Sequence, residues 1–372
     1  MQFKLFFLFF VVITSCSSNH EEENNFPLQE VKTFYKGMDL SFQMELESYN
    51  LPYKDKDNNP IEVLSFIKQN GCNLVRLKIW HTPLDDQNTL ANVKAYALKL
   101  KAQQIDFLLD FHYSDYWADP STQTPPVAWQ NLTHAQVQQE LYLYTKNVLN
   151  ELKNQGTMPK IVQIGNETDS GFLWNYGKVW GQFSNNWNNL AVFYKKASQA
   201  IREVNGNETK IMLHHSSVEN SIYYFNELLP FNIDYDIIGL SYYPQFQIKD
   251  LDLVQTKLNT LASSFDKDIM MVEVAYPFTF DYNDYNTNYI GSANQIITDY
   301  PATPNGQKEF MYKIILILKN IPNEKGIGFC YWAPDWVAFT GNQITSTAGS
   351  SWENQCLWDF DLKALPAFDV FQ

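Results

Sequence analysis

The sequence predicts an α/β protein built as one (β/α)8 TIM barrel, and the order of its segments carries that prediction. Eight short apolar runs rich in β-branched and aromatic residues alternate with longer amphipathic stretches. This alternation is typical of parallel strands joined by crossover helices. No low-complexity linker interrupts the chain after residue 26, and no long-period repeat is present. A length of 372 residues suits a single barrel domain, which we expect to span residues 31–372.

The expected strands are the eight apolar runs, at 33–40, 73–79, 106–111, 160–165, 210–214, 237–241, 268–272 and 326–332. The expected helices lie at 62–69, 90–103, 135–155, 186–204, 217–229, 251–264 and 306–319. The helix at 135–155 has the clearest pattern, because Val137, Leu141, Tyr144 and Val148 recur at near-helical spacing.

Polar residues gather where the expected strands end. His112 and Asp115 follow the third strand, Asn166 and Glu167 follow the fourth, and Glu273 ends the seventh. A (β/α)8 barrel brings the carboxyl ends of all its strands to one face, and that face holds the active site. The sequence therefore predicts that these distant residues form one site.

Two of these residues, Glu167 and Glu273, have the character needed for glycoside cleavage. Each follows an apolar strand, so each carboxyl would be partly desolvated and held by rigid backbone. Glycosidases place two carboxyls on either side of the scissile bond, one protonated and one ionised. Different surroundings separate the two pKa values enough for both roles near neutral pH. The alternative is that these are two unrelated surface or capping glutamates.

Composition and charge restrict the class of polymer that the protein can bind. The formal net charge is −14, which excludes nucleic acid as a partner and disfavours a strongly anionic polymer such as galacturonan. Aromatic residues make up 16% of the chain. Their flat faces can stack on sugar rings, although a core rich in Phe and Tyr would give the same composition. A neutral glycan fits both observations.

The first residues are expected to be a targeting segment rather than part of the fold. Residues 1–15 have a weakly basic start and a short apolar run, as in a signal peptide. The run ends at Cys16 in a pattern that resembles the bacterial lipobox, which predicts lipidation of Cys16. Residues 16–30 form an acidic tether that resembles the export signal of Bacteroidetes surface lipoproteins. We therefore expect a bacterial outer-membrane lipoprotein at the cell surface; an ordinary signal peptide with a chance cysteine is the alternative.

Three further cysteines remain, Cys72, Cys330 and Cys356. They lack the close spacing of metal ligands, and three thiols cannot all pair. We interpret them as small buried apolar residues, with one disulfide left open.

Several blocks along the chain resemble glycoside hydrolase family 53, the arabinogalactan endo-β-1,4-galactanases of clan A. The Asn-Glu pair at strand four and the Glu at strand seven are the signature of the clan. The surrounding blocks resemble the family: GMDLS (37–41), NLVRL (73–77), DFHYSDYWADP (110–120), QIGNET (163–168), GLSYYP (239–244), VEVAYP (272–277), YWAP (331–334) and SSWENQ (350–355). They span nearly the whole chain after the tether.

The resemblance implies roles for the central residues. Glu167 would be the acid/base and Glu273 the nucleophile. Asn166 would bind the 2-hydroxyl of the sugar in the −1 subsite, a contact that strengthens in the transition state. Arg76 would lie near Glu273 and help to keep it ionised. For Arg76, the alternative is a surface salt bridge.

The same resemblance implies further residues in the cleft. Tyr243 would donate to Glu273 or to substrate, Trp332 would form the floor of the −1 subsite, and His112 could instead be a satisfied core histidine. For each tryptophan, core packing is the alternative. The complete set of implied substrate-binding residues is Asp39, Arg76, His112, Asp115, Trp117, Asn166, Tyr243, Trp332 and Trp352.

The sequence departs from the family in two loops. Some bacterial members hold calcium after strand seven, and Asp281 and Asp284 could offer oxygen ligands there. The loop has no comparable His and its spacing is irregular, so calcium is not predicted and no cofactor is required. After strand eight, Trp332 is followed by Ala333, Pro334, Asp335 and Trp336, whereas an acidic residue is more usual in the family after the tryptophan.

The resemblance implies an enzyme that cleaves β-1,4-galactan or arabinogalactan side chains of pectin with retention of configuration. We expect it to act as a monomer. Two alternatives remain open. The first is another clan A endoglycanase, acting on mannan or β-glucan, since the same two glutamates would serve there. The second is a surface lipoprotein that binds glycan without cutting it, for which both glutamates would be unnecessary.

Overall fold

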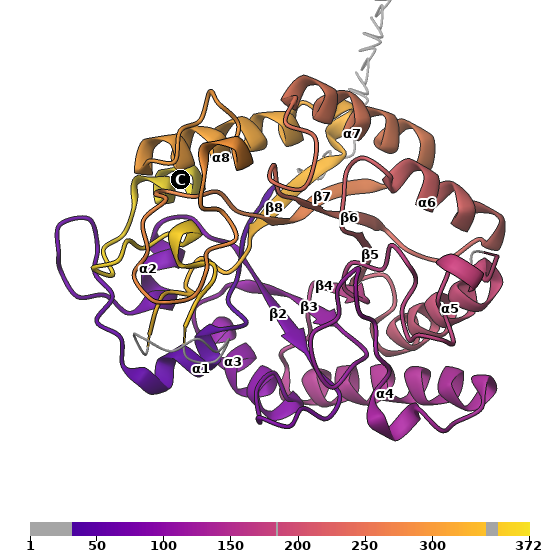
Figure 1. Cartoon of the computed structure of the whole chain (residues 1–372). Coiled ribbons are helices and arrows are strands. Elements are labelled where there is room, and N and C mark those ends of the chain that lie inside the picture. Colours follow the sequence, from indigo (N-terminus) through magenta and orange to yellow (C-terminus); the bar gives the residue numbers. More distant parts are fainter. Residues whose placement is uncertain (1–31, 184, 340–348) are drawn as a thin grey trace, which may run out of the picture. The chain divides into compact units, whose positions relative to one another are not determined.

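The computed structural model describes residues 32–183, 185–339 and 349–372. Its eight strands form a closed parallel barrel in chain order, with β1 paired to β8 (Figure 1). The strands are β1 (Tyr35–Asp39), β2 (Leu74–Ile79), β3 (Asp106–Phe111), β4 (Ile161–Ile164), β5 (Lys210–His215), β6 (Ile237–Tyr242), β7 (Asp268–Val274) and β8 (Gly326–Tyr331). The predicted (β/α)8 fold is confirmed, and Thr33–Gln372 forms one compact unit.

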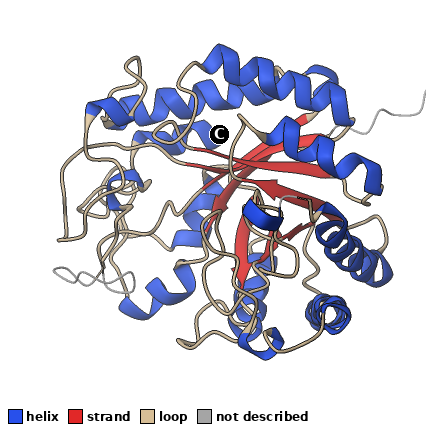
Figure 2. Ribbon diagram, turned by 45° about the vertical axis from the view of Figure 1, so that its right-hand side comes forward, coloured by secondary structure: helices blue, strands red, loops and turns tan. Residues whose placement is uncertain are grey.

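Helices surround the barrel on the outside (Figure 2). They are α1 (Gln43–Leu46), α2 (Val63–Gln69), α3 (Leu90–Ala102), α4 (His134–Gln155), α5 (Trp187–Asn205), α6 (Ser221–Leu228), α7 (Leu251–Phe265) and α8 (Pro304–Lys319). All seven expected helices are present. The short α1 was not expected, and α6 begins four residues later than the sequence indicated.

The helix ends have identifiable causes in the sequence. Thr133 begins α4 with a capping box, in which its hydroxyl accepts from the Gln136 backbone N–H and the Gln136 side chain accepts in return. Gly156 ends α4 in the left-handed conformation, with φ of 75°, that favours glycine. Thr303 caps α8, whose first residue is Pro304.

The inside of the barrel changes from apolar to polar toward its carboxyl end. Alternate residues of a strand share one face, so Leu74 is followed on the same face of β2 by Arg76. On β3, Leu108 is followed by Asp110 in the same way, and on β5 Met212 precedes His214. The apolar members form a small core of their own, and the polar members lie above it and support the site.

An irregularity in strand pairing sets the height of two site residues. Leu240 of β6 pairs with Met271 of β7, but the next residue, Ser241, pairs with Glu273. The extra residue on β7 is a β-bulge, a feature that commonly re-aims side chains at barrel rims. It brings Ser241 and Glu273 level with each other at the carboxyl end of the barrel.

The remaining sequence-based expectations concern the N-terminal segment and the cysteines. The signal peptide, the tether and the lipidated Cys16 lie outside the described residues. Cys72, Cys330 and Cys356 are buried and free, as the apolar interpretation predicted. Among the described residues, we find no helix with both the length and the apolar character to cross a membrane.

Candidate active site

A cleft of about 540 Å³ opens at the carboxyl ends of the strands. Eight of the nine implied substrate-binding residues line it together with both glutamates. These ten residues are Asp39, Arg76, His112, Trp117, Asn166, Glu167, Tyr243, Glu273, Trp332 and Trp352. Four of these residues, His112, Asn166, Glu167 and Glu273, were expected here from their positions at strand ends, and the other six were implied by the family resemblance.

Glu167 follows β4 on a backbone in the left-handed region, with φ of 45°. Its backbone N–H donates to Nδ1 of His214 at 3.2 Å, which helps hold this uncommon conformation. The Ser241 hydroxyl donates to Oε1 of Glu167 at 2.6 Å. Burial and then the charge of Glu273 raise the pKa of Glu167 well above its usual range, and the Ser241 bond opposes this rise. Glu167 is thereby suited to carry a proton near neutral pH.

Glu273 lies on β7 in a different environment. Arg76 Nη1 lies 2.9 Å from its Oε1, and the Tyr243 hydroxyl donates to its Oε2 at 2.9 Å. Burial raises the pKa of Glu273, while the positive charge of Arg76 and the bond from Tyr243 act in the opposite direction. The net effect is still a raised pKa, but of the two carboxyls Glu273 is the one paired directly with a buried positive charge.

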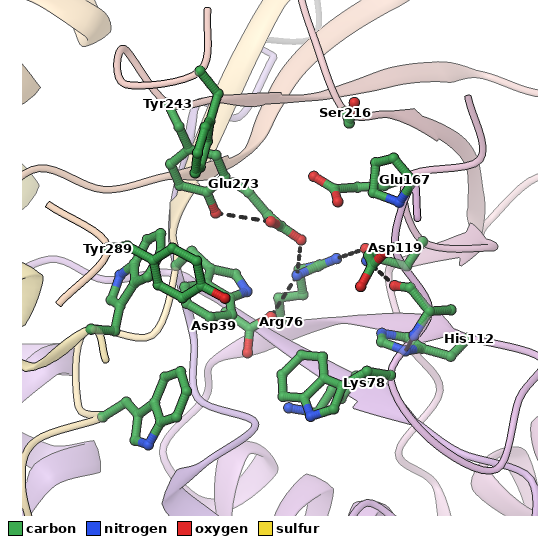
Figure 3. Close-up of a pocket in the computed structure, with 18 of the residues that line it drawn as sticks. Asp39, Arg76, Lys78, His112, Asp119, Glu167, Ser216, Tyr243, Glu273 and Tyr289 are labelled. Carbon is green, nitrogen blue, oxygen red and sulfur yellow. Dashed lines mark hydrogen bonds and ion pairs between the residues drawn. The ribbon is translucent and has the colours of Figure 1, made fainter. Parts of the chain in front are cut away.

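The two carboxyls face each other across the cleft (Figure 3). Oxygen atoms of Glu167 and Glu273 lie within 4.8 Å of each other. Retaining glycosidases have carboxyls about 5–5.5 Å apart, whereas inverting enzymes separate them by about 6.5–9.5 Å to admit a water. The spacing is that of a direct nucleophile and a proton donor.

Arg76 connects the acidic residues of the barrel floor. It is 2% exposed and forms ion pairs with Asp39 at 2.7 Å, Asp110 at 2.9 Å and Glu273 at 2.9 Å. The buried position excludes the alternative of a surface salt bridge. Because its planar fork binds several acceptors at once, Arg76 both holds Glu273 in place and offsets its negative charge.

Asn166 and His112 are both held by protein contacts. Asn166 Oδ1 accepts from Arg76 at 2.8 Å, and its Nδ2 donates to the carbonyl of Ala118 at 2.8 Å. An amide nitrogen carries a second hydrogen, which leaves one donor for a sugar hydroxyl. His112 Nδ1 accepts from the Ala118 N–H and from Trp80, and its Nε2 lies 3.1 Å from Asp110. With both nitrogens engaged, His112 matches the satisfied core histidine that was its alternative.

The structure corrects the placement of Asp115, which does not line the cleft. Its Oδ1 accepts from the backbone N–H of Thr82 at 2.9 Å, and its Oδ2 accepts from that of Val127 at 2.8 Å. Asp115 joins two loops and has both oxygens engaged. The sequence placed it correctly after β3 but could not show that the loop turns this side chain away from the cleft.

Aromatic side chains form one wall of the cleft. The Trp332 and Trp352 rings meet edge to face with centroids 4.6 Å apart, and Trp352 also meets Tyr243. Trp117 covers Lys78, whose Nζ lies 3.8 Å from the centroid of the Trp117 ring. Burial lowers the pKa of Lys78 to about 8. These rings offer flat apolar surface beside the two carboxyls.

Sequence reasoning missed several residues that support this site. Ser241 and His214 contact Glu167, Asp110 and Gln163 hold Arg76, and Lys78 lines the cleft. All five lie on strands, and their alternation with buried apolar residues was a signal that could have found them.

The described residues contain one group of three side chains at metal-ligand distances, Glu167, His214 and Glu273. His214 accepts a backbone N–H at Nδ1 and contacts Ser241 through Nε2, so neither ring nitrogen is free for a metal. In the loop after β7, the Asp284 oxygens accept from the Asn286 and Ser350 backbones. Asp284 thus joins its own loop to the segment that contains Ser350.

Comparison with known proteins identifies the family. The model of glycosyl hydrolase family 53 matches residues 35–371. The chain belongs to glycosyl hydrolase family 53. As a member of this family it is a glycoside hydrolase, and the resemblance seen in the sequence blocks is confirmed.

Relatives from different organisms support the assignment to family 53. The arabinogalactan endo-beta-1,4-galactanase of Cellvibrio japonicus is 33% identical over 347 residues, covering 91% of this chain and 90% of the relative. The endo-beta-1,4-galactanase of Bacillus subtilis is 29% identical, covering 92% and 86%. The solved GH53 catalytic domain of Ignisphaera aggregans superposes with a TM-score of 0.85 at 33% identity, covering 91% of this chain and 95% of that one.

Proposed function

We propose that this family 53 chain is a retaining endo-β-1,4-galactanase that cleaves galactan and arabinogalactan, including the side chains of pectin. The observation that carries the proposal is the pair of carboxyls within 4.8 Å, one beside Arg76 and one beside Ser241. The galactanase activity named for the relatives supports β-1,4-galactan as the substrate. The negative net charge of −14 suits a neutral rather than an acidic glycan.

In this mechanism Glu167 donates its proton to the glycosidic oxygen while Glu273 attacks the anomeric carbon, which gives a covalent glycosyl-enzyme and releases the leaving sugar. Glu167, now ionised, then takes a proton from water as the water displaces Glu273. Arg76 and Tyr243 hold Glu273 as an anion before attack and stabilise it again when it leaves. Asn166 is held so that its remaining N–H hydrogen can bind the 2-hydroxyl.

Release of reducing ends from purified polysaccharides tests the substrate. We expect rapid release from β-1,4-galactan, with oligosaccharides as early products, and little release from mannan, xylan or β-glucan. Galactose and glucose polymers differ in the orientation of the 4-hydroxyl, so a site shaped for one presents unpaired polar groups to the other. Preferred cleavage of mannan or β-glucan would reject the galactan assignment. Binding of glycan without any cleavage would indicate the non-catalytic alternative.

We further propose that the chain is held at the bacterial outer membrane by a lipid on Cys16. Support comes from the sequence, where a short apolar run ends at Cys16 and an acidic stretch follows. Cys16→Ser should move the enzyme from the membrane fraction to the soluble fraction and abolish incorporation of labelled palmitate. An unchanged distribution would contradict anchoring through Cys16.

A further inference from the structure

A row of hydrogen bonds behind Glu167 leads away from the cleft. The Ser241 hydroxyl donates to Oε1 of Glu167 at 2.6 Å, and Nε2 of His214 lies 3.0 Å from the Ser241 oxygen. The row closes on itself, because the backbone N–H of Glu167 donates to Nδ1 of His214 at 3.2 Å. Ser241 and His214 are fully buried, and neither lines the cleft. They can act on the reaction only through Glu167.

The closed row determines where each hydrogen lies. Nδ1 of His214 lies 3.2 Å from the Glu167 backbone nitrogen and 3.0 Å from Gln163 Nε2, which are both donors, and 3.1 Å from Asn166 Oδ1, which already accepts from Arg76. Because two donors meet Nδ1, we assign it as an acceptor that carries no hydrogen. Burial and then the charge of Arg76 lower the pKa of His214 well below its usual range, so the ring is neutral. A neutral imidazole without hydrogen on Nδ1 carries it on Nε2. His214 therefore donates to Ser241, whose single hydrogen is left to point at Glu167.

This order of donors distinguishes the two oxygens of Glu167. Oε1 receives the hydrogen of Ser241 and can only accept. When Glu167 is protonated, the Ser241 hydrogen bond favours Oε1 as the carbonyl oxygen and Oε2 as the oxygen that carries the proton. Oε2 has no hydrogen-bond partner among the described residues. Glu167 lines the cleft, so Oε2 is the oxygen left to meet the glycosidic bond.

We infer that Ser241 and His214 are positioning residues that hold the catalytic proton of Glu167 on Oε2. This inference rests on the proposed glycosidase function of Glu167. Ser241 and His214 keep their own hydrogens throughout; only the proton on Oε2 moves, first to the leaving oxygen and later back from water. Ser241 lies in the GLSYYP block, but the family resemblance implied no role for Ser241 or for His214.

Ser241→Ala tests the inference through the pH profile of kcat/KM on β-1,4-galactan. The Ser241 bond lowers the pKa of Glu167. Its loss should therefore move the alkaline limb of the profile up by about 0.5–1 pH unit. The acidic limb, set by ionisation of Glu273, should stay. We expect kcat near the optimum to fall about 10-fold, since the proton is free to occupy either oxygen, with KM unchanged.

Other titratable or charged groups face Glu167 and are kept in this experiment. They come from β2, β5, β7 and the loops after β4 and β6, and are Arg76, Asp169, His214, Tyr243 and Glu273. Ser241→Ala changes none of their charges. A movement of the alkaline limb alone therefore reports the lost bond rather than a changed neighbour.

Two further variants separate positioning from packing. Ser241→Thr keeps a hydroxyl and should restore both the alkaline limb and most of kcat. Ser221→Ala removes another fully buried serine hydroxyl, one that donates to the Val218 carbonyl, and should leave the profile unchanged. An alkaline limb that does not move in Ser241→Ala, or that moves equally in Ser221→Ala, would overturn the inference.

Nitrogen-15 NMR of the wild-type protein provides a test that does not depend on folding of a variant. The His214 ring should carry hydrogen on Nε2 alone and be neutral at about pH 6.5, where an ordinary histidine is about half protonated. Hydrogen on Nδ1 would overturn the inference. Failure of wild-type protein to cleave any polysaccharide would instead reject the proposed function, whatever the state of His214.

Discussion

Replacing Glu273 with alanine is expected to lower kcat on β-1,4-galactan by about 10⁴–10⁶-fold, because the attacking carboxylate is lost. Binding of galactan should change little, since the aromatic wall and Asn166 remain. Initial rates and isothermal titration with a galacto-oligosaccharide measure the two effects. Glu208→Ala is the control, since Glu208 is exposed in the loop before β5, at the opposite end of the barrel.

Azide distinguishes the roles of the two glutamates. Azide can enter the space left in Glu273→Ala and attack the anomeric carbon from that side, which yields an α-galactosyl azide. In Glu167→Ala it can replace the water that attacks the glycosyl-enzyme, which yields the β-azide. A β-azide from Glu273→Ala and an α-azide from Glu167→Ala would mean that the two glutamates have exchanged roles. Near-normal turnover of Glu273→Ala without azide would reject Glu273 as the nucleophile.

Arg76→Met is expected to give the largest loss of stability, roughly 3–5 kcal/mol. Arg76 is the shared partner of Asp39, Asp110 and Glu273, and its removal leaves three buried carboxyls without a countercharge. Denaturation by urea measures the change. The loss should lessen as the pH falls, because a carboxyl that is protonated in both the folded and the unfolded state no longer needs a countercharge.

A matched surface pair provides the control for Arg76. Lys308 and Asp369 form an ion pair at 2.7 Å with side chains 33% and 52% exposed. Because water screens such pairs, Lys308→Met should cost less than about 1 kcal/mol. Equal losses for Lys308→Met and Arg76→Met would contradict the central position assigned to Arg76.

The barrel could be predicted from the sequence because each strand and helix carries its own local signal. The 135–155 pattern differs from α4 by one residue at its start, where the Thr133 cap determines the boundary. Residues 217–220 were expected to be helical, but they form a turn in which the Ser217 N–H donates to His215. The four residues of α1 are too short for a periodic pattern to reveal.

The site could be predicted as far as strand ends determine it. Glu167 and Glu273 lie where the barrel rule places them, whereas Arg76 lies within β2 and was implied only by the family resemblance. The direction of Asp115 depends on where the loops after β2 and β3 place the backbone N–H groups of Thr82 and Val127, which no spacing encodes. Ser241 and Glu273 become level through a bulge, and a one-residue shift of register is not visible in either strand alone.

The anomeric configuration of the first product tests the central claim most directly. Proton NMR during the first minutes of galactan cleavage, before mutarotation, should show the new reducing end in the β-configuration. Retention follows from a direct attack by Glu273 with Glu167 as proton donor, at carboxyl oxygens within 4.8 Å. An α-anomer appearing first would mean that water attacks directly, and it would contradict the assignment of Glu273 as nucleophile.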